Sequence, residues 1–119
     1  MEKPSNLAVV VQKAYDWNLW LHPHVHKFSK DHRFSLGQSL LEASLSLLMN
    51  LVDAMYQSRN VSSLAAAMKD VNRLRYLVRL AKDFRLCSLK SYEFASRGLD
   101  EIGRMTGGWW RSAQAARSP

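Results

Sequence analysis

SSLAAAMKDVNRLRYLVRLAKDFRL, residues 62–86, is the stretch that decides the fold of this chain. Apolar residues recur in it at steps of three and four, which is the spacing of one buried face of an amphipathic α-helix. The members of this face are Leu64, Ala67, Val71, Leu74, Val78 and Ala81, with Leu77 and Phe84 at its margin. We therefore expect one long helix that packs against a core along one side.

The same stretch carries a second pattern, which is made of cations. Arg75, Arg79 and Lys82 are spaced four and three residues apart, so they form a row at the edge of the apolar face. Six cationic residues stand against two acids in residues 62–86, and this surplus is more than half of the chain's net charge of +7. The row is either an ordinary solvated surface or a fixed site for a polyanion, and the pattern alone leaves both open.

The whole chain has the size and composition of one small domain. It has 119 residues, of which 47% are hydrophobic, with five glycines and three prolines, so we expect one core and short connections. The basic balance predicts a polyanionic partner, nucleic acid first and an anionic membrane surface second. A single cysteine, Cys87, leaves no intrachain disulfide and suits a reducing cytoplasm. No secretory signal and no stretch of membrane-spanning length is visible, so we expect a cytoplasmic protein without a membrane partner.

An amphipathic helix is expected at residues 5–28. Pro23 removes one backbone donor, so it should either kink this helix near Leu19 or end it there. A kink is favoured, because apolar residues keep their helical spacing as far as Phe28. Residues 29–34 are expected to form a connection.

The helix expected over residues 35–58 is the most apolar one. It should begin with a capping box, in which the side chains of Ser35 and Gln38 bond each other's backbone amides. Its leucines occupy most of the circumference: Leu36, Leu40, Leu41, Leu45, Leu47, Leu48 and Leu51. A four-helix monomer covers only about half of each helix. We therefore expect this helix also to contact a second subunit, with Leu40, Leu47 and Leu51 as interface residues; a central helix in a monomer is the alternative.

The last helix is expected over residues 89–106, where Gly107-Gly108 is a strong signal for a helix end. Trp109 and Trp110 follow, and for this pair packing and contact with a partner are equally plausible.

With no strand signal, the chain is expected to be all-α, an antiparallel up-down-up-down four-helix bundle over residues 1–110. Residues 111–119 are expected to form a flexible C-terminal tail.

Patterns for catalysis or metal binding are weak. His22, His24 and His26 alternate, but only the first and the last share a helical face, and no acid lies four residues away on it. No Gly-rich phosphate loop and no Cys/His pairing at catalytic spacing is present. We therefore expect no metal site, no cofactor and no enzymatic activity.

Several short phrases occur in a fixed order between residues 15 and 109. They are Tyr15-Asp16, Trp20-Leu21, Pro23-His24-Val25, His32-Arg33-Phe34-Ser35-Leu36-Gly37, Arg73-Leu74-Arg75, Arg79-Leu80-Ala81, and Leu99-Asp100-Glu101-Ile102-Gly103-Arg104-Met105 with Gly107-Gly108-Trp109. Through them the chain resembles the four-helix-bundle family that includes the accessory variability determinant of diversity-generating retroelements and the proteins encoded in rRNA intervening sequences. Ser29 departs from the pattern, since many relatives have proline there.

The resemblance implies a homopentamer of bundles that forms a barrel with a basic outer surface. In the retroelement members this barrel is an adaptor: it binds the dedicated reverse transcriptase and the template RNA, and also DNA, and supports mutagenic cDNA synthesis without catalysing it. On this resemblance Arg73, Arg75 and Arg79 match the family's basic motif on the third helix, and Lys82 and Arg85 extend it.

Two alternatives to this accessory role stay open. In the first, the protein is an oligomeric or rRNA-associated scaffold whose basic row docks an acidic protein surface. In the second and weaker one, it is an RNA-processing enzyme, which would need a titratable pair such as His32 with Glu42 or Asp53.

Overall fold

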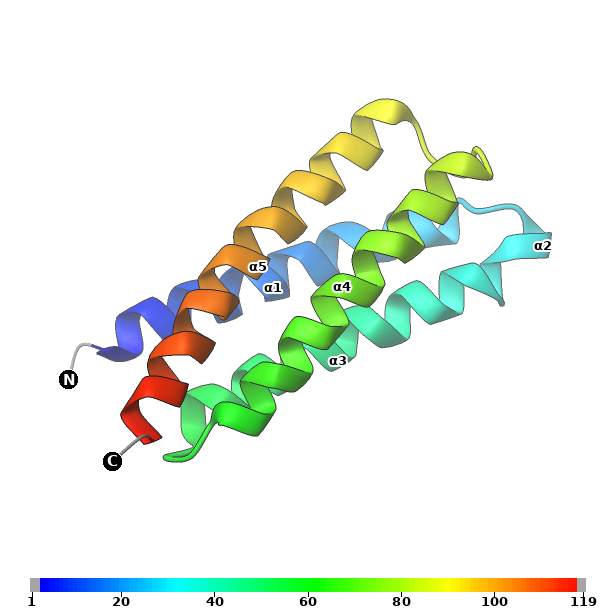
Figure 1. Cartoon of the computed structure of the whole chain (residues 1–119). Coiled ribbons are helices and arrows are strands. Elements are labelled where there is room, and N and C mark those ends of the chain that lie inside the picture. Colours follow the sequence, from blue (N-terminus) through cyan, green and yellow to red (C-terminus); the bar gives the residue numbers. More distant parts are fainter. Residues whose placement is uncertain (1–2, 118–119) are drawn as a thin grey trace.

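The computed structural model describes residues 3–117, and the side chains of residues 8–116, as four long helices and one short one (Figure 1). They are α1 (Lys3–His26), α2 (Lys30–Arg33), α3 (Leu36–Tyr56), α4 (Val61–Asp83) and α5 (Leu89–Arg117). Residues 3–117 contain no strand, and the molecule measures 51 × 20 × 19 Å along its principal axes. The predicted all-α four-helix bundle is confirmed.

The four long helices form a closed ring, in which each packs against two others. The helix α3 lies against α1 and α4, and α5 lies against α4 and α1. In Figure 1, α1 leads from the N-terminus to the end where α2 lies, α3 returns, α4 leads back to the α2 end, and α5 returns again. The edge between α1 and α3 is therefore on the opposite side of the bundle from the edge between α4 and α5.

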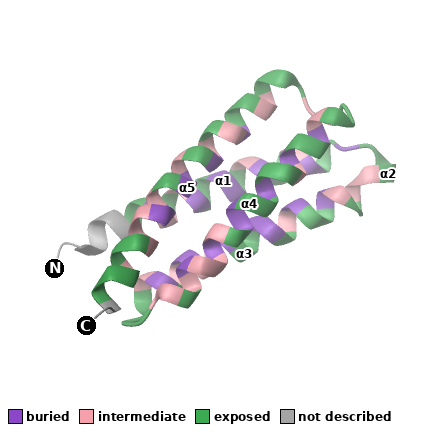
Figure 2. Ribbon diagram, viewed as in Figure 1, coloured by how far each residue is buried: buried purple, intermediate pink, exposed green. Residues whose placement is uncertain are grey.

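The apolar face predicted for residues 62–86 is the buried face of α4. All six of its main members are buried, while Leu77 is half-buried and Phe84 is exposed. Figure 2 shows buried segments alternating with exposed ones along α4. Burial of one such face against the other helices is the main stabilising contribution to the bundle. The acid Asp70 is also buried, on the side of α4 toward α3, where it accepts hydrogen bonds from Ser46 Oγ (2.7 Å) and Asn50 Nδ2 (2.9 Å).

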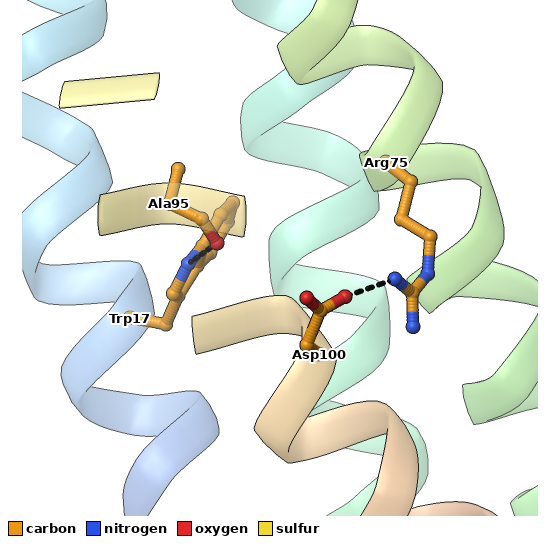
Figure 3. A network of polar contacts seen from close by, with 4 residues as sticks. All are labelled: Trp17, Arg75, Ala95 and Asp100. Carbon is orange, nitrogen blue, oxygen red and sulfur yellow. Dashed lines mark hydrogen bonds and ion pairs between the residues drawn. The ribbon is translucent and has the colours of Figure 1, made fainter. Parts of the chain in front are cut away.

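The contact between α1 and α5 depends on a glycine. The indole of Trp17 is buried, and its Nε1 donates to the carbonyl oxygen of Ala95 at 3.2 Å (Figure 3). A Cβ atom added at Gly98 would lie 2.7 Å from Trp17 Cδ1, closer than real Cβ contacts. Gly98 thus lets the Trp17 ring lie directly on the backbone of α5.

The expectation that Leu40, Leu47 and Leu51 form an interface with a second subunit is wrong. All three are at most 1% exposed, because they form the buried face of α3 within the single chain. The exposed apolar side chains of α3 are others: Leu45 is 55% exposed and Met49 is 47% exposed. Spacing alone identified an excess of apolar surface on this helix but did not locate it.

Three local predictions near α2 need correction. The helix α1 continues through Pro23 and ends at His26, two residues before the expected end, and the expected connection contains the short helix α2. No capping box forms, because Ser35 has φ −117° and ψ −87° and makes no side-chain cap bond. Its hydroxyl instead lies 3.4 Å from the carbonyl oxygens of Asp31 and His32.

The predicted helix end at Gly107-Gly108 is also wrong, because α5 continues to Arg117. No glycine of the described residues has a positive φ, so neither glycine adopts the left-handed conformation of a helix C-cap. Beyond the glycines, the chain packs against the core through three half-buried residues, Trp109, Trp110 and Ala113. This packing outweighs the low helix propensity of the two glycines. Part of the predicted tail is therefore helical; Ser118 and Pro119 lie outside the described residues.

Candidate nucleic-acid interface

The row of cations predicted on α4 lies at the edge where α4 meets α5. Arg75 is the member best defined by its contacts: its guanidinium forms an ion pair with Asp100 of α5 (Figure 3). Both side chains remain solvent-accessible, at 41% for Arg75 and 56% for Asp100. The contact therefore orients the guanidinium without burying it, so its charge stays available to a ligand.

A glycine of α5 makes room for this arginine. A Cβ atom added at Gly103 would lie 2.8 Å from Nη2 of Arg75 and 3.3 Å from Cγ1 of Val71. The guanidinium thus lies against the backbone of α5, between Gly103 and the carboxylate of Asp100. Asp100 and Gly103 both belong to the phrase of residues 99–105 that carries part of the family resemblance. In the structure, Asp100 pairs with the guanidinium of Arg75 and Gly103 makes room for it.

The other two members of the row continue along the same edge. Lys82 Nζ lies 4.8 Å from the centroid of the Tyr92 ring of α5 and 3.7 Å from Oδ1 of Asp83. Arg79 lies between Arg75 and Lys82, is exposed, and has no ion pair within the part of the chain whose side chains are described. Because Asp70 is turned toward α3, it does not neutralise the row.

The remaining two predicted binding residues do not lie in the row. Arg73 is separated from Arg75 by 200° around the helix, and it lines a shallow hollow of about 480 Å³ with Lys69, Tyr76 and Trp110. Arg85 follows the end of α4 in a left-handed conformation, with φ of 62°, and is exposed. The sequence-predicted set thus divides into a row of three, one cation at the end of the row and one on another face.

Residues 8–116 include four histidines and one cysteine, side chains that are often used in metal binding and catalysis. They contain no group of three or more His, Cys, Asp and Glu side chains that could hold a metal ion. Of the alternating histidines, His22 and His26 are exposed, whereas Nδ1 of His24 bonds the Trp20 carbonyl oxygen at 2.8 Å. Burial raises the pKa of the Cys87 thiol, which lowers its thiolate fraction and its nucleophilicity at neutral pH.

Asp100 and Gly103 are site residues that sequence reasoning missed. The charges of residues 89–106 sum to zero, so charge alone gives no reason to single out Asp100. The ion pair joins residues 25 positions apart on different helices, which helical spacing cannot reveal. The one signal in the sequence that could have identified them is the phrase of residues 99–105, in which Asp100 and Gly103 have no role in a simple amphipathic pattern.

No helix in residues 3–117 has both the length and the apolar character that crossing a bilayer requires.

Comparison with known proteins supports the fold and the family. No curated protein matches the chain. A solved structure from Bacteroides thetaiotaomicron, of a protein with unknown function from the S23 ribosomal protein family, is similar with a TM-score of 0.81 and 19% sequence identity. The match covers 89% of this chain and 98% of that chain, and at this identity it shows a shared fold. A family model described as bAvd-like matches residues 8–113, so the chain belongs to the bAvd-like family.

Proposed function

We propose that this protein is a non-catalytic accessory protein of a diversity-generating retroelement. In this role it binds the reverse transcriptase and the template RNA in the cytoplasm and supports mutagenic cDNA synthesis. Membership of the bAvd-like family supports the role, and the resemblance noted in the sequence supplies the retroelement context. The observation that carries the binding function is the solvent-accessible row of Arg75, Arg79 and Lys82 along the α4/α5 edge.

The row suits the phosphate backbone of a nucleic acid. Its members rise along α4 at intervals of about 6 Å and about 4.5 Å, since each helical residue advances about 1.5 Å. Arginine binds phosphate with two parallel hydrogen bonds, and contacts of this kind carry no base information. Binding should therefore be strongly salt-dependent and largely indifferent to sequence.

We further propose that antiparallel bundles assemble as a homopentamer through the α1/α3 edge. Asn18 of α1 donates to the Ser44 carbonyl oxygen of α3 at 3.0 Å, and the residues that follow these two, Leu19 and Leu45, are 60% and 55% exposed. Met49, one turn beyond Leu45, is also exposed. Burial of this apolar edge between copies would leave the opposite α4/α5 edge facing outward.

Charge reversal within the row tests the binding function. Arg75→Glu with Arg79→Glu should lower affinity for single-stranded RNA in a gel-shift titration by at least tenfold, with helix content and assembly unchanged. The matched control is Arg59→Glu with Arg111→Glu, which changes the net charge equally at two exposed residues outside the row. Equal losses in the two double variants, or unchanged affinity in the first, would contradict a local binding site.

The scaffold role is the second candidate, and one contact favours it. Arg75 already pairs with a carboxylate, Asp100, so the row is able to accept an acidic protein surface. The ratio of absorbance at 260 and 280 nm separates the two candidates. If the row binds nucleic acid, protein purified at low salt should have a raised ratio that a high-salt wash lowers. A ratio that already has the value of protein alone before the wash supports the scaffold.

A further inference from the structure

Two segments far apart in the sequence meet at the end of the bundle toward which the cation row runs. Phe84, the residue directly after α4, stacks on His32 of α2, with ring centroids 5.1 Å apart and an angle of 19° between the ring planes. In Figure 1, α2 and the C-terminal end of α4 lie at this same end. The contact places α2 against Phe84, which lies two positions after Lys82, the last member of the row.

Two phenylalanines at this end are poorly covered by the rest of the chain. Phe84 is 52% exposed, so His32 covers one side of it and leaves much of the ring accessible. Phe34, directly after α2, is 74% exposed. Burial of a phenylalanine side chain normally contributes to folding, so these two exposed rings contribute little to the stability of the single chain.

Cationic residues flank both phenylalanines in the sequence. The Cζ atom of Arg33 lies 5.8 Å from the centroid of the Phe34 ring, and Arg33 Nε is buried without a hydrogen-bond partner in the described structure. Arg85 directly follows Phe84, and the left-handed turn at Arg85 keeps it close to the end of α4. Within four residues of the two phenylalanines in the sequence, the cations Lys30, Arg33, Lys82 and Arg85 outnumber the acids Asp31 and Asp83.

We propose that this surface, formed by Phe34 and Phe84 with the flanking cations Lys30, Arg33 and Arg85, stacks unpaired bases of single-stranded nucleic acid. We call it the aromatic end. Aromatic faces next to cations are the usual means of holding single strands, because every base has a flat face and the phosphates pair with the cations. A duplex keeps its bases stacked inside, so it gains nothing from exposed phenylalanines.

The aromatic end rests on the proposed binding function and deepens it. The row on α4 holds the phosphates of a strand, and the strand continues past Lys82 onto the two phenylalanines. The row accepts single-stranded and double-stranded nucleic acid, while the aromatic end selects strands whose bases are free. The preferred ligand is therefore a single-stranded segment of RNA or DNA.

The first test uses the unaltered protein and three ligands of one sequence: a single strand, its duplex, and the same strand with abasic positions throughout. Abasic positions keep the phosphates and remove the faces available for stacking. In fluorescence anisotropy, the single strand should bind more tightly than the abasic strand. The expected difference in affinity is roughly tenfold for each base that stacks. Equal affinity for these two strands would overturn the aromatic end.

The second test removes the rings. Phe34→Leu with Phe84→Leu should abolish the preference for the strand with bases and leave binding to the abasic strand and its salt dependence unchanged. Phe34→Trp with Phe84→Trp should retain the preference. Tyr56→Leu is the control, because Tyr56 is 79% exposed and is the last residue of α3, away from α2.

The outcomes separate this inference from the proposed function. If the unaltered protein bound none of the three ligands, both the aromatic end and the proposed binding function would be overturned. Binding that depends on Arg75 and Arg79 but is indifferent to both phenylalanines would overturn the aromatic end alone. A lower molecular mass for the leucine variant in light scattering would show that these rings contact a second copy of the chain, which also overturns the inference.

Discussion

At the scale of single residues, the candidate interface is governed by a competition for Arg75. The carboxylate of Asp100 holds the guanidinium in place, but a phosphate would have to share or displace this partner. An exposed ion pair contributes only about 0.2–1 kcal/mol to stability, so displacement by a phosphate costs little. Asp100 is therefore expected to weaken binding while it orients the arginine.

Asp100→Asn tests this competition. The substitution removes one negative charge beside Arg75, so affinity for single-stranded RNA should rise several-fold at low salt. The slope of log K against log salt should steepen by about 0.7, the value for one additional phosphate contact on a single strand. Anisotropy titrations at several salt concentrations measure both quantities. Weaker binding by the variant would mean instead that orientation by the carboxylate matters more than its charge.

Two glycines of α5 offer a matched pair for stability. Gly98→Ala places a methyl group 2.7 Å from the buried Trp17 ring, whereas Gly103→Ala places one 2.8 Å from the flexible end of Arg75. Alanine favours the helix equally in both variants. Gly98→Ala should therefore be less stable than Gly103→Ala by about 1–3 kcal/mol, because the Trp17 ring is buried. Arg75 is flexible, and the other close neighbour of Gly103, Cγ1 of Val71 at 3.3 Å, needs to shift by only a few tenths of an ångström. Denaturant unfolding measures the difference, and equal stabilities would contradict the close contact at Gly98.

At the scale of helices, amphipathic spacing predicted the four long helices and which face of α4 is buried, but it did not predict α2. Spacing failed where tertiary packing competes with a local signal. Gly107-Gly108 resembles a helix end, yet Trp109 and Trp110 pack against the core and continue α5. The position of Asp100 beside Arg75 was equally inaccessible, since it depends on how two helices are placed side by side.

Gly107→Ala and Gly108→Ala distinguish a continuous helix from a terminated one. Neither new Cβ atom would approach another atom closer than 3.5 Å, so alanine fits at both positions. Each substitution should raise the free energy of unfolding by about 0.5–1 kcal/mol, because alanine loses less backbone entropy in a helix. If α5 ended here with a left-handed glycine, alanine would destabilise the protein instead. Urea denaturation of the two variants gives the sign.

At the scale of the whole molecule, the two candidate surfaces lie on opposite edges of the bundle. The α1/α3 edge is apolar, with Tyr15, Leu19, Leu45 and Met49 exposed, and the α4/α5 edge carries the cation row. A ring of copies joined at the first edge would repeat the second edge around its outside. Repetition gives multivalent binding, in which one strand contacts several rows and affinity exceeds that of one chain.

Leu45→Glu with Met49→Glu tests this arrangement, because it places two charges on the apolar edge without touching the core or the row. Light scattering at micromolar concentration should show the mass of an oligomer for the unaltered protein and about 13.6 kDa for the variant. Leu89→Glu is the control, since Leu89 is 63% exposed on α5 and should leave the mass unchanged. The monomeric variant keeps its row, so it should still bind RNA, but more weakly and with a shallower salt dependence. An unaltered protein of single-chain mass would remove the assembly and the multivalent binding together, and the row would then act one copy at a time.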